Sequence, residues 1–165
     1  RRVPASRQWL ADLPKAADCK PDLQAWAACY GIPPDAVVDI GFVPNRLMGD
    51  VLRGCDAALF PNRCEGGTNL VAMEALASGL PTILSANTGH LDLVKCVPCR
   101  ALKRQNASMK PGWGESDVGE CVAHLEKIFI DPKGARLQAM EAARIMQEQW
   151  TWTLRAAKVC EALGY

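Results

Sequence analysis

A chain of 165 residues, 49% of them hydrophobic and 22% charged, is long enough and apolar enough to bury a hydrophobic core as one globular domain. Its formal net charge of +1 gives no reason to expect a nucleic acid or an anionic membrane as its partner. No apolar run reaches the length that spans a bilayer, so we expect a cytoplasmic protein, and peripheral attachment to a membrane stays open.

The first third of the chain alternates helical patterns with short apolar runs. Residues 21–30 place apolar side chains at helical spacing. Residues 37–42 are rich in β-branched side chains and predict a short strand. Residues 46–54 have one apolar helical face, and residues 57–60 predict the next strand.

The most informative stretch continues from that strand to Pro81. Gly66 and Gly67 indicate a turn, and the helix that follows ends at Gly79 and Pro81, because glycine suits the left-handed cap and proline cannot continue the helix. The first amides of this helix, at residues 69–71, lack intrahelical partners and lie at the positive end of the helix dipole. Strand, glycine turn and helix N-terminus together predict an anion-binding site.

Two carboxylates bracket this predicted site. Glu65 precedes the turn, and Glu74 lies about 9 Å beyond Thr68 along the helix axis. A diphosphate held by the amides would leave its ribose near Glu74 and its other substituent near Glu65, and carboxylates accept strong hydrogen bonds from sugar hydroxyls. The alternative is that Glu65 is solvated and Glu74 is an exposed helical residue, neither with a ligand.

The second half continues the alternation of strands and helices. Such alternation predicts an α/β fold, a doubly wound parallel sheet flanked by helices with right-handed crossovers, and ligands bind such sheets beyond the carboxyl ends of the strands. We expect one domain over residues 1–165, of which residues 133–165 are a C-terminal helical tail. The expected elements are strands at 82–84 and 97–102, loops at 86–94 and 105–115, and helices at 116–130, at 133–149 and from about 152 to 164.

Eight cysteines raise the question of a metal or redox site. Most lie among apolar residues, where a free cysteine behaves as a small hydrophobic side chain. Cys96 and Cys99 have ligand-like spacing, but a structural zinc site needs a second pair, and none stands at a recognisable spacing. We therefore expect reduced thiols and no metal ligand.

Residues 65–82 resemble the two-glutamate donor motif of retaining GT-B glycosyltransferases, the group that includes glycogen, sucrose-phosphate and capsular polysaccharide synthases. The family pattern is a Glu, a short Gly-containing turn, an apolar helix start, a second Glu and then Ala-Met/Leu-Ala-x-Gly-x-Pro. The resemblance covers roughly residues 34–164 and implies a Rossmann-like domain, one half of a GT-B fold that lacks its first strands. This chain has one residue more between its two glutamates than the family usually has, and it falls in the turn at 66–68.

The loop at 86–94 resembles the family's Gly-Gly-x-x-Glu segment, which lies beside the diphosphate and the sugar. Thr88 replaces the first Gly, Asp92 replaces the Glu, and the Gly89 backbone is the contact that carries over. His90 either reaches the donor or is a surface or capping histidine. Arg63 either adds positive charge near the phosphates or is solvated. By position, the resemblance implies Glu65 as the catalytic-site carboxylate on the sugar and Gly67, Thr68, Asn69, Leu70, Glu74 and Gly89 as donor-binding residues. We add Arg63 and His90 to this donor-binding set from their places in the sequence.

The resemblance implies a glycosyltransferase of hexosyltransferase type that binds a nucleotide-diphosphate sugar without a cofactor or metal. A carbohydrate or lipid-linked acceptor would bind an N-terminal domain outside this chain, so we expect the chain alone to be inactive. Family members open the donor domain with a strand-Gly-Arg-Lys segment, and none precedes Pro21. Two alternatives stay open: a sugar-nucleotide epimerase that uses His90 and Asp92, and a non-catalytic binding module.

Overall fold

The computed structural model describes residues 22–164. The chain divides into two compact units, residues up to Pro44 and residues from Asn45 on, and each is described by itself. The expectation of a single domain stays a prediction.

The first unit contains the helix α2 (Leu23–Cys29) and the 3-10 turn η2 (Pro34–Ala36). The side chain of Asp22 caps α2 by accepting a hydrogen bond from the amide of Ala25 at 2.9 Å. The strand predicted at 37–42 is wrong, because this segment is irregular and Phe42 is 93% exposed. Asp39 Oδ1 accepts a hydrogen bond from the amide of Gly41, whose φ is +62°, and this local turn competes with an extended backbone.

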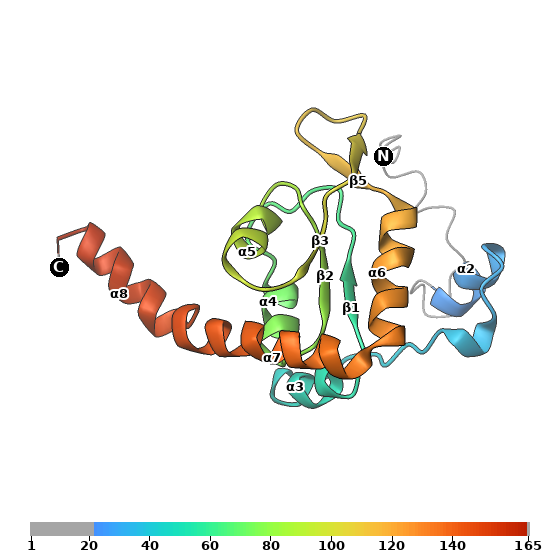
Figure 1. Cartoon of the computed structure of the whole chain (residues 1–165), viewed down its shortest axis with the longest axis horizontal. Helices are drawn as coiled ribbons and strands as arrows, with labels where there is room; N and C mark the ends of the chain where they lie inside the picture. Colours follow the sequence, from blue (N-terminus) through green and yellow to red (C-terminus); the bar gives the residue numbers. More distant parts are fainter. Residues whose placement is uncertain (1–21, 165) are drawn as a thin grey trace, which may run out of the picture. The chain divides into compact units, whose positions relative to one another are not determined.

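The second unit is built on a parallel sheet of three strands in the order β1-β2-β3. Phe60 lies beside Leu84, and Leu84 lies beside Ala101. Figure 1 follows the chain through this unit, and the α/β class with helices flanking a parallel sheet is confirmed. The elements are α3 (Asn45–Arg53), β1 (Ala58–Phe60), α4 (Leu70–Ala77), β2 (Thr82–Ser85), α5 (His90–Cys96), β3 (Arg100–Leu102), β4 (Gln105–Ala107), β5 (Gly114–Ser116), α6 (Val118–Ile130), α7 (Pro132–Gln149) and α8 (Trp152–Ala162).

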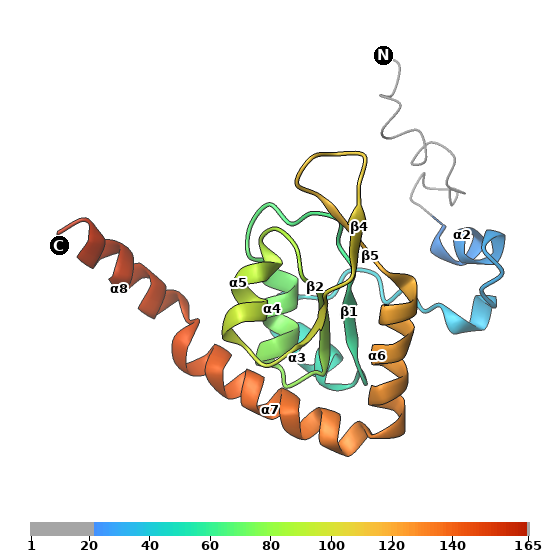
Figure 2. The same ribbon diagram turned by 45° about the horizontal axis from the view of Figure 1, so that its top comes forward.

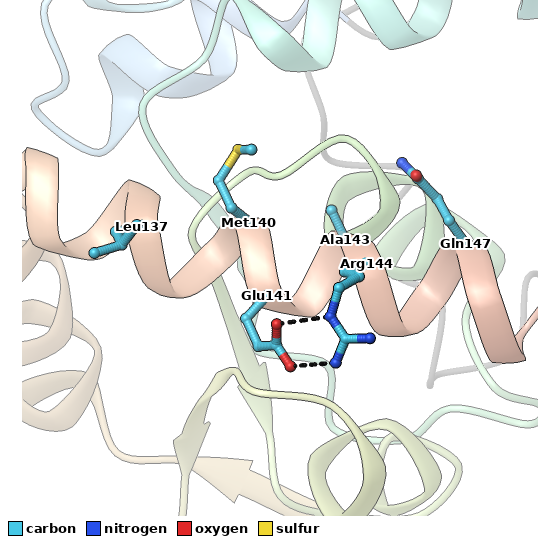
Figure 3. Close-up of a pocket in the computed structure, with 6 residues that line it drawn as sticks. All are labelled: Leu137, Met140, Glu141, Ala143, Arg144 and Gln147. Atoms are coloured by element: carbon cyan, nitrogen blue, oxygen red, sulfur yellow. Dashed lines mark hydrogen bonds and ion pairs between the residues drawn. The ribbon is translucent and has the colours of Figure 1, made fainter.

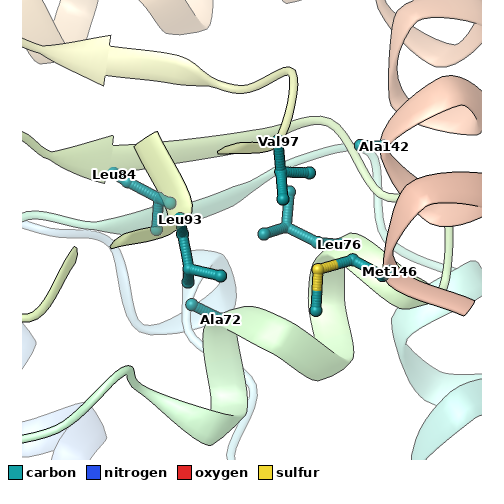
Figure 4. Packing of buried hydrophobic residues seen from close by; sticks show 7 residues of the cluster. All are labelled: Ala72, Leu76, Leu84, Leu93, Val97, Ala142 and Met146. Carbon is teal, nitrogen blue, oxygen red and sulfur yellow. The ribbon is translucent and has the colours of Figure 1, made fainter. Parts of the chain in front are cut away.

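Helices cover both faces of this sheet, and β2 is buried between them. Figures 1 and 2 show α4 and α5 on one side of the strands and α6 on the other. Leu84 points into a cluster formed by side chains of α4, α5 and α7 (Figure 4). Its neighbour Ile83 points the other way, toward Cys121 and Ile128 of α6. Both β2 residues are 0% exposed, as expected of a strand with two covered faces.

The predicted ends of α4 are confirmed. Asn69 caps its first turn, and the chain leaves the last turn through Gly79, whose φ is +68°. Ala72 and Leu76 of α4 are buried against the sheet and α7. The first amides of α4 are therefore presented at the carboxyl end of β1.

Two predicted loops contain regular structure. The segment at 86–94 becomes helical from His90 onward, and the segment at 105–115 belongs mostly to the antiparallel hairpin of β4 and β5. The hairpin strands are too polar to show a hydrophobic alternation, so their sequence gave no strand signal. The helices α7 and α8 occupy most of the predicted helical tail. No helix within residues 22–164 is both long and apolar enough to cross a membrane.

Candidate functional site

Two loops meet where β1 and β2 end at the carboxyl edge of the sheet. The loop after β1 carries Glu65, and the loop after β2 carries Thr88 and Gly89. The amide of Gly89 donates to the carbonyl oxygen of Glu65 at 3.2 Å, and the amide of Glu65 donates to Thr88 Oγ1 at 2.8 Å. The structure therefore brings together the two segments that the sequence marked separately.

Gly89 allows this contact because it has no side chain. A Cβ atom at this position would lie 1.5 Å from the carbonyl oxygen of Gly67 and 3.0 Å from that of Glu65. The φ of Gly89 is −64°, so close packing, and not an unusual backbone conformation, requires glycine here. Thr88, in the place of the family's first Gly, adopts a positive φ of +40°.

The carboxylate of Glu65 is half-buried and is oriented by a neighbour. Asn62 Nδ2 donates to Glu65 Oε2 at 3.2 Å, and the carbonyl of Asn62 accepts from Asn87 Nδ2 at 2.9 Å. Asn87 also donates to Gln105 Oε1 at 3.0 Å. Sequence analysis missed Asn62 and Asn87 as supporting residues, because isolated asparagines in loops give no periodic signal.

A buried chain of hydrogen bonds runs below the glycine turn. His90 is 0% exposed, with Nδ1 2.8 Å from Ser85 Oγ and Nε2 2.8 Å from Asn69 Nδ2. Asn69 Oδ1 accepts the amide of Ala72 in the cap of α4, so its Nδ2 faces the histidine as a donor. The His90 ring is consequently neutral, accepts at Nε2 and donates from Nδ1 to Ser85.

The pKa of His90 agrees with a neutral ring. Burial lowers this pKa from its ordinary value, while hydrogen bonding to the backbone of Ser85 and the negative charge of Glu65 partly oppose the shift. The expectation of a surface or capping histidine is wrong, since the ring is enclosed at the start of α5. Any part that His90 plays in donor binding is therefore indirect in this conformation.

The second glutamate lies apart from these loops. Glu74 is exposed on α4 and lines a groove between α3 and α4, with Asn45 and Met48 on the other wall. Leu70 is 58% exposed at the start of α4, and Thr68 is half-buried beside it. Along the motif, the half-buried carboxylate of Glu65 thus comes first, the backbone amides at the start of α4 follow, and the exposed carboxylate of Glu74 comes last.

Arg63 is engaged with the β4–β5 hairpin. Its guanidinium lies 2.6 Å from Glu115 Oε1, with the two side chains 62% and 49% exposed. Its carbonyl oxygen accepts the amide of Gly114 at 3.0 Å. The charge that Arg63 was expected to offer to phosphates is thus balanced by Glu115.

The alternative chemistries receive no support from the geometry. His90 is buried whereas Asp92 is exposed, so the two do not face one surface as an epimerase acid and base. Burial raises the pKa of Cys99 to about 11, the opposite of what a reactive thiolate needs. Within residues 22–164, no three His, Cys, Asp or Glu side chains are grouped so that they could hold a metal ion.

A separate groove lies on α7 (Figure 3). It is lined by Leu137 and Met140 and by Arg144, which is paired with Glu141. Arg136 of the same helix donates to the carbonyls of Gly79 and Cys55, which precede β2 and β1. This groove therefore lies at the amino ends of the strands, opposite to the glycine turn.

We expect the substitution Gly89→Ala to lower the free energy of unfolding by about 1–3 kcal/mol, because the new methyl group must displace the Gly67 carbonyl. Gly66→Ala is the matched control, since a Cβ at that position meets no atom within 4 Å. Urea denaturation of both variants tests this. Equal stability of the two variants would show that the contact between the loops is not tight in solution.

We expect stability to fall as the pH drops through about 6.5. Burial lowers the pKa of both His90 and His124 from 6.5, so below that value the unfolded chain binds protons that the folded chain does not. The measurement is urea denaturation at pH 7.5 and 5.5 for the wild type and for His90→Gln and His124→Gln. Each substitution should reduce the loss between the two pH values, and an unchanged loss would contradict the burial of that ring in a neutral form.

The comparisons with known proteins agree with this fold. No curated protein matches the chain. A solved structure, the sucrose-phosphate synthase from Thermosynechococcus elongatus, is similar with a TM-score of 0.67 and 19% identity over 86% of this chain and 33% of that one. The chain thus spans about a third of that protein and shares the fold of one half of a GT-B enzyme. A family model described as "Family 4 Glycosyltransferase in conflict systems" matches residues 14–159, and the chain therefore belongs to this family of glycosyltransferases.

Proposed function

We propose that this chain is the donor-binding domain of a retaining glycosyltransferase and that it binds the diphosphate of a nucleotide sugar at the glycine turn. The observation that carries the proposal is the contact between Gly89 and the backbone of Glu65 and Gly67. It closes two loops over the N-terminal end of α4, where unpaired amides and the helix dipole favour an anion.

The two glutamates fit the two ends of such a donor. The groove that Glu74 lines between α3 and α4 offers an exposed carboxylate to the hydroxyls of a ribose. Glu65 lies on the other side of the turn. Asn62 donates a hydrogen bond to its Oε2. Its remaining acceptor capacity is suited to the hydroxyls of the sugar.

Transfer would depend on stabilising the leaving diphosphate. Negative charge develops on the phosphate oxygens as the bond to the sugar breaks, and preorganised amides stabilise that charge without reorganising. The chain would supply these amides and Glu65. A carbohydrate or lipid-linked acceptor would be held by a domain outside this chain. We place this reaction in the cytoplasm, without a cofactor or a metal.

We expect Glu74→Gln to weaken the binding of a nucleoside diphosphate by about 1.5–3 kcal/mol, because the amide keeps the shape of the side chain but loses the charge-assisted bond to the ribose. Isothermal titration with UDP, ADP and GDP tests this. Glu126→Gln, an exposed glutamate on α6, is the control and should bind as the wild type does. Unchanged affinity in Glu74→Gln would remove this residue from the site.

We expect Glu65→Ala to act on the sugar and not on the nucleotide. Affinity for the nucleotide sugar should fall while affinity for the bare nucleoside diphosphate stays as in the wild type. Equal losses for both ligands would instead assign Glu65 a structural role through Asn62 and the Thr88 contact. If the wild type binds no nucleoside diphosphate at all, the non-catalytic module becomes the better description.

A further inference from the structure

The turn between β1 and α4 contains a residue in a costly backbone conformation. Asn69 has a φ of +60° and a ψ of 87°, outside the regions that residues with a side chain usually adopt. The first amides that would bind a diphosphate follow Asn69 directly in the sequence. The direction of these amides therefore depends on what holds Asn69 in place.

Two hydrogen bonds hold the Asn69 side chain, one on each side of its amide group. Its Oδ1 accepts the amide of Ala72 at 3.1 Å, within α4, and its Nδ2 lies 2.8 Å from His90 Nε2. The first bond is local to the helix. The second is the one that ties Asn69 to a different part of the fold.

His90 is itself fixed by the centre of the sheet. Its Nδ1 lies 2.8 Å from Ser85 Oγ, and Ser85 is the last residue of β2 and 0% exposed. Gly89, the residue before His90, packs against Gly67 in the turn. A continuous path of buried and half-buried groups therefore runs from β2 through Ser85 and His90 to Asn69.

We propose that His90 is a positioning residue of the donor site, an inference that rests on the function proposed above. His90 lies below the turn, fully enclosed, and acts by holding Asn69 so that the first amides of α4 and the glycine turn keep one arrangement before the donor arrives. Hydrogen-bond donors that are already held in place bind an anion more tightly, because less conformational entropy is lost on binding.

Two substitutions distinguish a His90 that positions Asn69 from a His90 that only fills a buried space. The amide of a glutamine reaches the place of the histidine Nε2, so His90→Gln keeps an acceptor for Asn69 and loses the partner of Ser85. The amide of an asparagine reaches only the place of Nδ1, so His90→Asn keeps the partner of Ser85 and leaves Asn69 without its acceptor. Both variants remove the imidazole ring from the same buried position.

The first measurement is the dissociation constant for UDP, ADP and GDP, obtained by titration of the whole chain at pH 7.5. We expect His90→Gln to stay within about three-fold of the wild type and His90→Asn to bind roughly ten-fold more weakly. His124→Gln is the control, because His124 is a half-buried histidine on α6, on the opposite face of the sheet. Equal affinities of the Gln and Asn variants overturn the proposal.

The second measurement needs no ligand. The amide of Ala72 is protected by Asn69 Oδ1, so its hydrogen exchange reports whether Asn69 is held. Exchange at Ala72 should accelerate in His90→Asn and stay near the wild-type rate in His90→Gln. If the wild type binds none of the three diphosphates, the proposed function fails, and this exchange still decides whether His90 positions Asn69; equal exchange in the two variants overturns it.

Discussion

The close approach of Gly89 to the turn at Glu65 and Gly67 is the constraint on which the candidate site depends. Parallel strands bring their carboxyl ends to one edge of the sheet, but this alone leaves the following loops free to diverge. Here the amide of Gly89 bonds to Glu65, and the space for a Cβ atom is already filled by the Gly67 carbonyl. One missing side chain thus fixes two loops against each other.

The close packing of Gly89 also fixes the position of a buried side chain in the core, that of His90. Because His90 follows Gly89, the same placement puts the imidazole between Ser85 and Asn69. A buried polar side chain costs free energy unless it is hydrogen-bonded, and here both ring nitrogens have partners. By contrast, Nδ1 of His124 is buried and has no hydrogen-bond partner among residues 22–164. The hydrogen-bonding groups of the His90 ring are therefore better satisfied than those of the His124 ring.

Much of the site could be predicted from sequence because its signals are local. Glycine and proline mark the ends of α4, and two short apolar runs give the strands β1 and β2 that flank it. The strand expected at 37–42 failed because a β-branched run needs a partner strand, and the turn at Gly41 was available instead. The β4–β5 hairpin was missed since its polar strands have no hydrophobic period.

The buried position of His90 could not be predicted for a different reason. A histidine early in a helix has no pattern that separates a surface position from an enclosed one. Its burial follows from tertiary contacts with Ser85 and Asn69, which come from two other elements. Long-range side-chain pairs of this kind leave no trace in the periodicity of a single chain.

A diphosphate bound at the glycine turn, as proposed above, would need positive charge to balance its own. The dipole of a helix stabilises an exposed anion at its N-terminus by only about 0.3–1 kcal/mol, and the sequence contains no Arg-Lys pair. Arg63 is the nearest cation in the sequence, but it is paired with Glu115. Both partners of that pair are about half exposed, and exposed ion pairs add only about 0.2–1 kcal/mol. Exchanging Glu115 for a phosphate oxygen would therefore cost Arg63 little, while the backbone bond from Gly114 to Arg63 would keep its loop in place.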